Sequence, residues 1–309
     1  MLGQEIFTAL LFYLPFLLTI VFGIFAMAIG ILAIFSGTIV VLVLAVYGVY
    51  ALLRDTGTIE LILSHLKYVW TFISHDIEKN LQESFILSGL EKIPAKPALF
   101  LCHPHGLIGY SWMLHFCYEI SQWPHETPKP LVAIHSILFR LPIVRDILEQ
   151  FRCIEAKEDI IKRHLKEGKS VAIVTGGIEE MVHNGDTTVK IVLQKRKGYA
   201  RIAKECAVPI VPMFTVGENE LFPNETFWLW KHVAGLIHTW TKIYVPLPSW
   251  RSMTQWAHIL RKPVDRPIET FVLGVIETKQ KEESQIRKDC LDLYTHFFRD
   301  SKIQATIVA

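Results

Sequence analysis

Two histidines follow a short apolar segment of the chain, in the order Cys102-His103-Pro104-His105-Gly106. An imidazole titrates near neutral pH, so a histidine at the end of a strand can serve as a general base. The proline would stiffen the turn, and the glycine would let a substrate approach the backbone. Structural histidines and a metal-binding pair are the alternatives. The metal alternative needs at least one further ligand in register, and none stands out.

Glycines and acids follow a second predicted strand. Ser170–Thr175 runs into Gly176 and Gly177, and Glu179 and Glu180 come shortly after them. Glycines at this place permit close approach of the backbone, and an acid beyond them can fix the tautomer of a histidine or bind a polar substrate group. Two adjacent glutamates also suit a helix N-terminus, because they complement its dipole. Both interpretations stay open at this point.

Three consecutive cations, Lys195-Arg196-Lys197, stand before Gly198 at the start of a predicted helix. Beside free helix-terminal N–H groups they would bind phosphate, and a solvated charge run is the alternative. The chain has no G-x-S-x-G, no Walker loop and no G-x-G-x-x-G, which disfavours serine hydrolases, nucleotide hydrolases and Rossmann dehydrogenases. A net charge of +2 provides no broad positive surface for nucleic acid.

Short β-rich runs alternate with helical runs through most of the chain. Strands are predicted at Ala98–Cys102, Leu131–His135, Ser170–Thr175, Val208–Val216 and Thr270–Ile276. Helices are predicted at Gly106–Ile120, Pro142–Gln150, Glu158–Glu167 and Lys197–Cys206, and an amphipathic helix within residues 57–90. Strands that are apolar throughout suit a sheet covered on both faces, so we expect an α/β sandwich with a largely parallel sheet. Its active site would lie beyond the carboxyl ends of the strands.

The first part of the chain is apolar without interruption. From Ile6 to Leu53 there are 48 consecutive residues without Asp, Glu, Lys, Arg or His. As a helix this run would extend about 72 Å, roughly two crossings of a 30 Å hydrocarbon core. It predicts a transmembrane hairpin with spans near 6–26 and 34–53, and a helix dipping into one leaflet is the alternative. All 32 Lys and Arg lie at or after Arg54, which favours a cytosolic position for the rest of the chain.

Five blocks follow one another along the chain: His103–Gly106, Leu138–Pro142 with Arg145-Asp146, Val174–Glu180, Arg196–Tyr199 and Val211–Glu220. Taken in order, they resemble the H-P-H-G, N-F-R-x-P-x-x-R, V-G-G-x-x-E, R-K-G-F and V-P-x-Y-x-F-G-E-N-E motifs of the type-2 diacylglycerol acyltransferase family, which includes monoacylglycerol and wax-alcohol acyltransferases. Two segments depart from the family's pattern: Leu138 replaces Asn in N-F-R, and Leu273–Glu277 replaces G-E-P-I. The H-x4-D of related acyltransferases is absent, because Ile108 and Tyr110 stand where the Asp would be.

The resemblance implies a fold, an activity and a location. We expect a glycerolipid-acyltransferase-like α/β sandwich, with a membrane hairpin over 1–55 and a cytosolic acyltransferase domain over 56–309. Its aromatic segment 222–256 would border the membrane interface or form a packed core. The implied enzyme transfers an acyl group from acyl-CoA to a lipid alcohol, diacylglycerol by preference. Monoacylglycerol, a wax alcohol or a sterol is the alternative acceptor, and a non-catalytic lipid-binding membrane protein is the alternative from another class.

The endoplasmic reticulum membrane and lipid droplets are the implied locations. Acyl-CoA, the lipid alcohol and the membrane are the implied partners, nucleic acid is not expected, and a homo-oligomer is left open. No permanently bound cofactor or metal is expected. Aligned with the family's blocks, one histidine, His105 by preference and His103 otherwise, would take the proton of the acceptor hydroxyl while Glu180 holds the imidazole. The expected substrate-binding residues, with the basic ones for the CoA phosphates, are Pro104, Gly106, Arg140, Arg145, Gly176, Gly177, Lys195, Arg196, Lys197, Gly217, Glu218 and Asn219.

Overall fold

The computed structural model describes residues 37–62, 75–117, 122–124, 127–141, 144–182, 189–221, 228–241, 244, 254 and 266–308. Backbone contacts divide the chain into two compact units. The first comprises Met1–Ile73 with Ile137–Gln150, and the second comprises Ser74–Ser136 with Phe151–Ala309. Each unit is described by itself. The division of the chain into 1–55 and 56–309 stays a prediction.

In the first unit, a helix and a distant segment are joined by polar contacts. Helix α2 (Gly37–Asp55) contacts the segment made of the 3-10 turn η2 (Leu138–Arg140) and α6 (Val144–Gln150). Asp146 of α6 is buried, accepts a hydrogen bond from the Tyr50 hydroxyl at 2.6 Å, and pairs with Arg54 at 3.3 Å. These contacts, with the hydrogen bond from the Tyr47 hydroxyl to the Arg140 carbonyl, place Arg140 and Asp146 against the C-terminal half of α2.

The predicted membrane hairpin is only partly covered by the structure. Its first span, 6–26, lies outside the described residues, and its second, 34–53, overlaps α2. Among the helices within the described ranges, none is long and apolar enough to cross a membrane.

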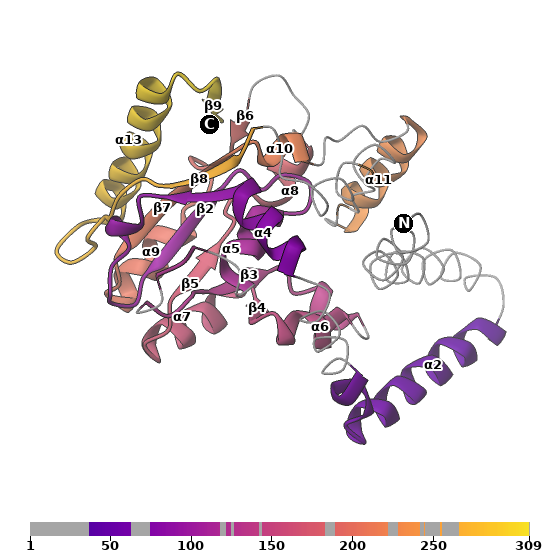
Figure 1. Cartoon of the computed structure of the whole chain (residues 1–309). Coiled ribbons are helices and arrows are strands. Elements are labelled where there is room, and N and C mark those ends of the chain that lie inside the picture. The colour runs from indigo at the N-terminus through magenta and orange to yellow at the C-terminus, as the bar shows by residue number, and fades with distance from the viewer. Residues whose placement is uncertain are drawn as a thin grey trace. The chain divides into compact units, whose positions relative to one another are not determined.

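The second unit is built on a seven-stranded sheet with the order β1-β8-β7-β2-β5-β3-β4 (Figure 1). All neighbouring strands are parallel except β7 and β8, which are antiparallel. The predicted α/β fold with a largely parallel sheet is therefore confirmed. The strands are β1 (Phe85–Ser88), β2 (Leu99–His103), β3 (Leu131–Ile134), β4 (Cys153–Glu155), β5 (Val171–Ile173), β7 (Ile210–Val216) and β8 (Ile268–Val272), and β6 (Val189–Ile191) pairs with β9 (Ala305–Ile307) in a separate parallel sheet.

The central strand, β2, is buried along its whole length between β7 and β5. Both faces of such a strand are covered, so its sequence is apolar until it reaches a histidine at its last position. Leu101 of β2 pairs with Ile173 of β5. Two residues further on, the same register brings Thr175 level with His103, at the carboxyl edge of the sheet.

Helices cover both faces of this sheet. On one face, α7 (Glu158–Lys166), α9 (Gly198–Cys206) and α13 (Glu283–Ser301) contribute to the main apolar core, which includes Leu99 and Leu101. On the other face, Phe116 of α5 (Tyr110–Cys117) packs against Phe100 and stacks on Trp112 of the same helix. Side chains alternate along a strand, so His103 shares the face of Leu99 and Leu101. The remaining helical elements of the second unit are α4 (His75–Ser84), η1 (Leu90–Lys92), α8 (Gly177–Val182), α10 (Glu218–Leu221) and α11 (Trp228–Thr241).

The predicted helices and strands differ from the structure where a strand is short or where glycines with positive φ angles delay the start of a helix. Residues 85–88, expected in a helix, form β1, in which Phe85 and Leu87 are buried and alternate with less buried residues. The helix predicted from Gly106 begins only at Tyr110, because Gly106 and Gly109 have positive φ angles of 59° and 74°. The three-residue strands β4, β6 and β9 are too short to give a periodic signal.

Candidate active site

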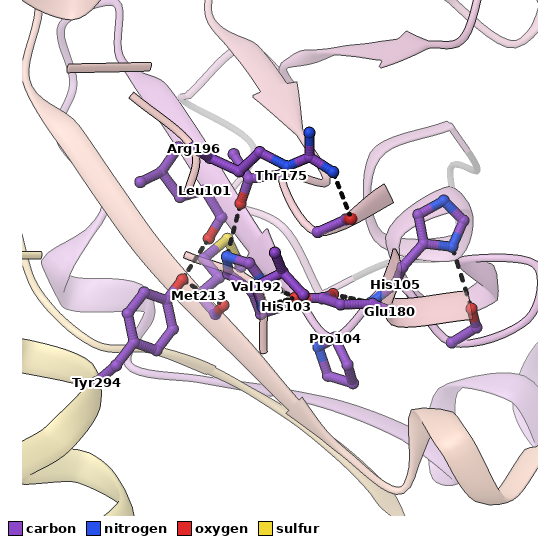
Figure 2. Close-up of polar contacts among 12 residues, drawn as sticks. Leu101, His103, Pro104, His105, Thr175, Glu180, Val192, Arg196, Met213 and Tyr294 are labelled. Atoms are coloured by element: carbon purple, nitrogen blue, oxygen red, sulfur yellow. Dashed lines mark hydrogen bonds and ion pairs between the residues drawn. The ribbon is translucent and has the colours of Figure 1, made fainter. Parts of the chain in front are cut away.

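His103 ends β2 and is fully buried, at 0% exposure. Its Nδ1 lies 2.6 Å from Oε1 of Glu180, and its Nε2 lies 2.6 Å from Oγ1 of Thr175. The ring of Tyr294, on α13, packs against the imidazole in a T-shaped arrangement with centroids 5.3 Å apart. Both ring nitrogens of His103 therefore have polar partners, Glu180 and Thr175 (Figure 2).

Glu180, on α8, is the polar centre of the site. Its Oε1 also accepts the N–H of Val192 at 2.7 Å, and its Oε2 accepts the N–H of His105 at 2.7 Å. Burial by itself raises the pKa of Glu180, but the charge and hydrogen bond of His103, with the two backbone donors, outweigh burial and lower the pKa. The carboxylate is thus ionised at neutral pH. It holds the imidazole of His103 and the main chain of His105. The sequence favoured His105 as the histidine whose imidazole Glu180 holds.

Gly176 allows this carboxylate to reach the histidines. A Cβ at Gly176 would lie 1.7 Å from Cδ of Glu180, a distance that no side chain can tolerate. The next residue, Gly177, has a φ of 54°, which a residue with a side chain rarely adopts. The two glycines therefore serve the turn from β5 into α8 and the approach of Glu180 to His103.

The imidazole of His105 is turned away from Glu180 (Figure 2). Its Nδ1 lies 3.1 Å from the carbonyl oxygen of Gly106, and a carbonyl can only accept, so Nδ1 carries the proton. The part of the chain that the structure describes supplies no hydrogen-bond partner for Nε2. Burial lowers the pKa of His105, and the Gly106 carbonyl and Glu180 only partly offset that effect. His105 is thus a neutral imidazole at pH 7 with a lone pair at Nε2.

Glu218 fixes the turn that follows His105. Its carboxylate is 1% exposed and accepts the N–H of Tyr110 at 2.8 Å, the N–H of Ser111 at 3.1 Å and the Ser111 hydroxyl. A Cβ at Gly106 would lie 2.7 Å from Cγ of Glu218, so the turn passes directly over this side chain. Burial raises the pKa of Glu218 to about 7, partly offset by the Ser111 and Tyr110 donors. The Glu218 carboxyl therefore binds the start of α5.

The predicted phosphate-binding cations lie beside the glycine turn. Nη2 of Arg196 donates to the carbonyl of Gly176 at 3.3 Å and lies 3.6 Å from Oε1 of Glu179. Its Nε is buried and has no partner among the described residues. The neighbouring Lys195 and Lys197 are exposed. The structure thus brings this basic segment to the turn that carries Thr175 and Glu180.

Two other predicted basic residues belong to the first unit. Arg140 is exposed at the end of η2, and Arg145 pairs with Glu149 at 2.7 Å. The hydrogen bond that Arg145 donates to the Glu149 carboxylate raises the pKa of Arg145. These two residues belong to the same unit as α2, and their predicted role in binding CoA stays a prediction.

The remaining predicted residues are Pro104, Gly217 and Asn219. Pro104 follows a cis peptide bond, and its carbonyl accepts the indole N–H of Trp112 at 2.9 Å. Gly217, with a φ of 91°, joins β7 to α10. Oδ1 of Asn219 is buried and has no partner among the described residues. Within the described ranges, no group of three or more His, Cys, Asp or Glu side chains could hold a metal ion.

Three residues of the site were missed in the sequence. Thr175 ends a predicted strand, Ser111 lies within a predicted helix, and Tyr294, on α13, lies outside the helices predicted above. The hydroxyl of Tyr294 lies 2.9 Å from the carbonyl of Leu101 and 3.1 Å from that of Met213, which fixes α13 against β2 and β7. Of the three, only Thr175 could have been predicted as a site residue from the sequence, because it directly precedes Gly176 and Gly177.

Comparison with known proteins identifies the family. A model of the family described as diacylglycerol acyltransferase matches residues 57–300. The chain belongs to the diacylglycerol acyltransferase family. The resemblance found in the five sequence blocks is thereby confirmed, and three of those blocks, His103–Gly106, Val174–Glu180 and Arg196–Tyr199, meet around Glu180.

Several members of the diacylglycerol acyltransferase family resemble this chain. Acyl-CoA wax alcohol acyltransferase 1 of Mus musculus is 33% identical over 46% of this chain and 44% of its own. 2-Acylglycerol O-acyltransferase 3 of Homo sapiens is 29% identical over 58% of this chain and 55% of its own. Diacylglycerol O-acyltransferase 2 of Rattus norvegicus is 27% identical over 67% of this chain and 55% of its own. The chain spans about half the length of the curated relatives it matches.

One solved structure is also similar to this member of the diacylglycerol acyltransferase family. The crystal structure of the 1-acyl-sn-glycerophosphate acyltransferase PlsC from Thermotoga maritima aligns with a TM-score of 0.47 and 15% identity. The alignment covers 84% of this chain and 95% of that one.

Proposed function

We propose that this protein is an acyl-CoA-dependent O-acyltransferase that esterifies a lipid alcohol, with diacylglycerol as the preferred acceptor and triacylglycerol as the product. Its membership of the diacylglycerol acyltransferase family supports the reaction class. The names of the similar proteins include wax alcohol and 2-acylglycerol acyltransferases, so a wax alcohol or a monoacylglycerol is the alternative acceptor.

The observation that carries this proposal is the state of the His105 imidazole. Its proton is on Nδ1, bound to the Gly106 carbonyl, and its lowered pKa keeps Nε2 unprotonated at pH 7. Nε2 takes the proton of the acceptor hydroxyl as that oxygen attacks the acyl carbonyl carbon, and CoA leaves as the thiol. General-base assistance of this kind contributes about 10²–10⁴ in rate.

The basic segment Lys195-Arg196-Lys197 suits the phosphates of CoA. Arg196 is fixed to the Gly176 carbonyl, and Lys195 and Lys197 are exposed beside it. Guanidinium and ammonium groups bind phosphate oxygens through charge-assisted hydrogen bonds. This position supports CoA binding next to the turn of Gly176 and Gly177.

We also propose a location for the protein. The charge-free run Ile6–Leu53 supports a membrane anchor with the remaining chain on the cytosolic side, and the family resemblance implies that the membrane is the endoplasmic reticulum, with access to lipid droplets. The acyl chain and the lipid alcohol would then reach the site from the bilayer. Asn224-Glu225-Thr226 is a glycosylation sequon. Glycosidase-sensitive mass at Asn224 in cells would contradict the cytosolic placement.

The test is an acceptor panel. The full chain in microsomes receives labelled acyl-CoA with diacylglycerol, monoacylglycerol, a long-chain alcohol or a sterol, and ester products are separated. We expect triacylglycerol as the main product, and a loss of about 10²-fold or more in His105→Ala. His296→Ala is the matched control, because His296 is exposed on α13. If no ester forms with any acceptor and no CoA thiol is released, the chain is a non-catalytic lipid-binding protein instead.

A further inference from the structure

Strands β6 and β9 form a small parallel sheet apart from the main one. They pair in register from Val189 with Ala305 to Ile191 with Ile307. Among the described strands, only β9 pairs with β6. A sheet of two short strands is marginal by itself, so other contacts must hold it in place. Its position matters because β6 leads directly into Val192, whose N–H binds Glu180.

One peptide group, between Ile191 and Val192, joins this small sheet to the active site. Its carbonyl, which belongs to Ile191, accepts the N–H of Val308 at 2.8 Å. Its N–H, which belongs to Val192, donates to Oε1 of Glu180 at 2.7 Å. A trans peptide group is planar, with its carbonyl and its N–H on opposite sides, so fixing one fixes the other. The N–H of Val308 therefore sets the direction in which Val192 donates to Glu180.

The hydrogen bond from Val192 helps to keep the Glu180 carboxylate ionised. Burial raises the pKa of Glu180, and the interaction with His103, the N–H of Val192 and the N–H of His105 together outweigh burial and lower this pKa. A carbonyl that accepts a hydrogen bond polarises its peptide group, and the N–H of that group becomes a better donor. The bond from Val308 to the carbonyl therefore strengthens the bond from Val192 to Glu180.

Apolar side chains fix the small sheet on the main core. Ile191 is fully buried in that core, and the half-buried Ile303 and Ile307 pack against it. Beyond β6 the chain reaches Arg196, whose Nη2 donates to the carbonyl of Gly176 at 3.3 Å. The segment from β6 to Arg196 thus contacts both the turn after β5 and the carboxylate on α8, and β9 holds the beginning of this segment in place.

We propose that Val308 is a positioning residue for the Glu180 carboxylate, and that residues 303–308 hold Val308 in place. This rests on the acyl transfer proposed above. The N–H of Val308 fixes the peptide group that donates to Glu180, and Glu180 holds the imidazole of His103 and the main chain of His105. Val308 acts only through this series of hydrogen bonds. Its loss therefore slows the chemical step and leaves the binding of acyl-CoA unchanged.

The test replaces Val308 in the full chain in detergent micelles, with labelled acyl-CoA and diacylglycerol as substrates. Val308→Pro removes the N–H, whereas Val308→Ala keeps it and is the matched control. We expect kcat to be about 10-fold lower in Val308→Pro than in Val308→Ala, the effect of weakening one hydrogen bond to a charged group. The KM for acyl-CoA should be the same in both variants, because Arg196 keeps its own contact with the Gly176 carbonyl.

Two further readouts separate positioning from a general loss of structure. In a Glu180→Ala background the carboxylate is gone, so Val308→Pro should lower the residual kcat no further. A merely structural role would lower kcat by the same factor in both backgrounds. Hydrogen exchange at the Val192 amide should be about 10-fold faster in Val308→Pro than in Val308→Ala, because the peptide group is no longer held, and this measurement needs no activity.

The outcomes separate this inference from the proposed function. Equal kcat in Val308→Pro and Val308→Ala overturns the positioning role, as does an equal loss in the Glu180→Ala background or an unchanged exchange rate at Val192. If the wild type forms no ester with any acceptor, the proposed function fails, and the exchange rate still decides whether Val308 holds the Val192 amide. If thermal unfolding shows that Val308→Pro is not folded, Ile307→Gly replaces it, because Ile307 packs against the core, and Thr306→Gly, at an exposed residue of the same strand, is its control.

Discussion

The raised pKa of Glu218 makes the stability of the protein depend on pH in a specific way. Glu218 is buried and accepts hydrogen bonds from the start of α5, and its pKa is about 7, compared with an ordinary value of 4.5. Replacing it by Gln keeps the shape of the side chain and removes its titration. We therefore expect Glu218→Gln to change how the free energy of unfolding varies with pH.

The magnitude follows from proton linkage. Between pH 4.5 and 7, the folded wild type keeps a proton on Glu218 that the unfolded chain has released, so its free energy of unfolding falls as pH rises. The slope is about 1.4 kcal/mol per pH unit, which gives about 3.5 kcal/mol over the interval. Above pH 7 both states are ionised and this contribution is constant. The lost hydrogen bonds of the variant add an offset that does not depend on pH.

The assay is urea unfolding of the full chain in detergent at pH 5, 6, 7 and 8. The stability difference between Glu218→Gln and wild type should shift in favour of the variant by about 2.5 kcal/mol from pH 5 to pH 8, because the assay covers only part of the interval. Glu220→Gln is the control, because Glu220 lies on the same short helix and is exposed. A difference for Glu218→Gln that stays constant from pH 5 to 8 would refute the reasoning.

Three further outcomes are expected. The acid limb of kcat/KM should fall with a pKa below 6.5, because burial lowers the pKa of His105; a limb above 6.5 would exclude His105 as the base. Gly176→Ala should abolish turnover, because its Cβ would lie 1.7 Å from the Glu180 carboxyl; wild-type kinetics of a folded variant would show that the contact is dispensable. Tyr50→Phe should reduce stability by about 1.5–3 kcal/mol through the buried carboxylate of Asp146. Tyr47→Phe is the control, because it loses only an exposed hydrogen bond to the Arg140 carbonyl. Equal losses of stability for the two variants in thermal unfolding would contradict the role given to the Asp146 carboxylate.

Local patterns predicted much of the fold. Uninterrupted apolar runs ending at Cys102, His135 and Val216 correspond to β2, β3 and β7 within a few residues, because a parallel strand buried on both faces needs apolar side chains throughout. Strand β1 was not predicted. Its four residues depend on pairing with β8, more than 180 residues further along the chain, and local propensity does not contain that information.

The sequence by itself determined the family, the parallel sheet and the chemical groups at the strand ends, because these follow from local order along the chain. Only the tertiary structure decided how those groups are paired. The pleat of β2 and the turn after β5 direct Glu180 to His103, although His105 was favoured, and add Thr175 as the second partner. Glu218 was predicted to bind substrate. In the structure it follows β7, lies against Gly106 and accepts a hydrogen bond from the start of α5. Side-chain direction at an edge of the sheet depends on strands and helices that are distant in sequence, and so it is fixed only when they pack.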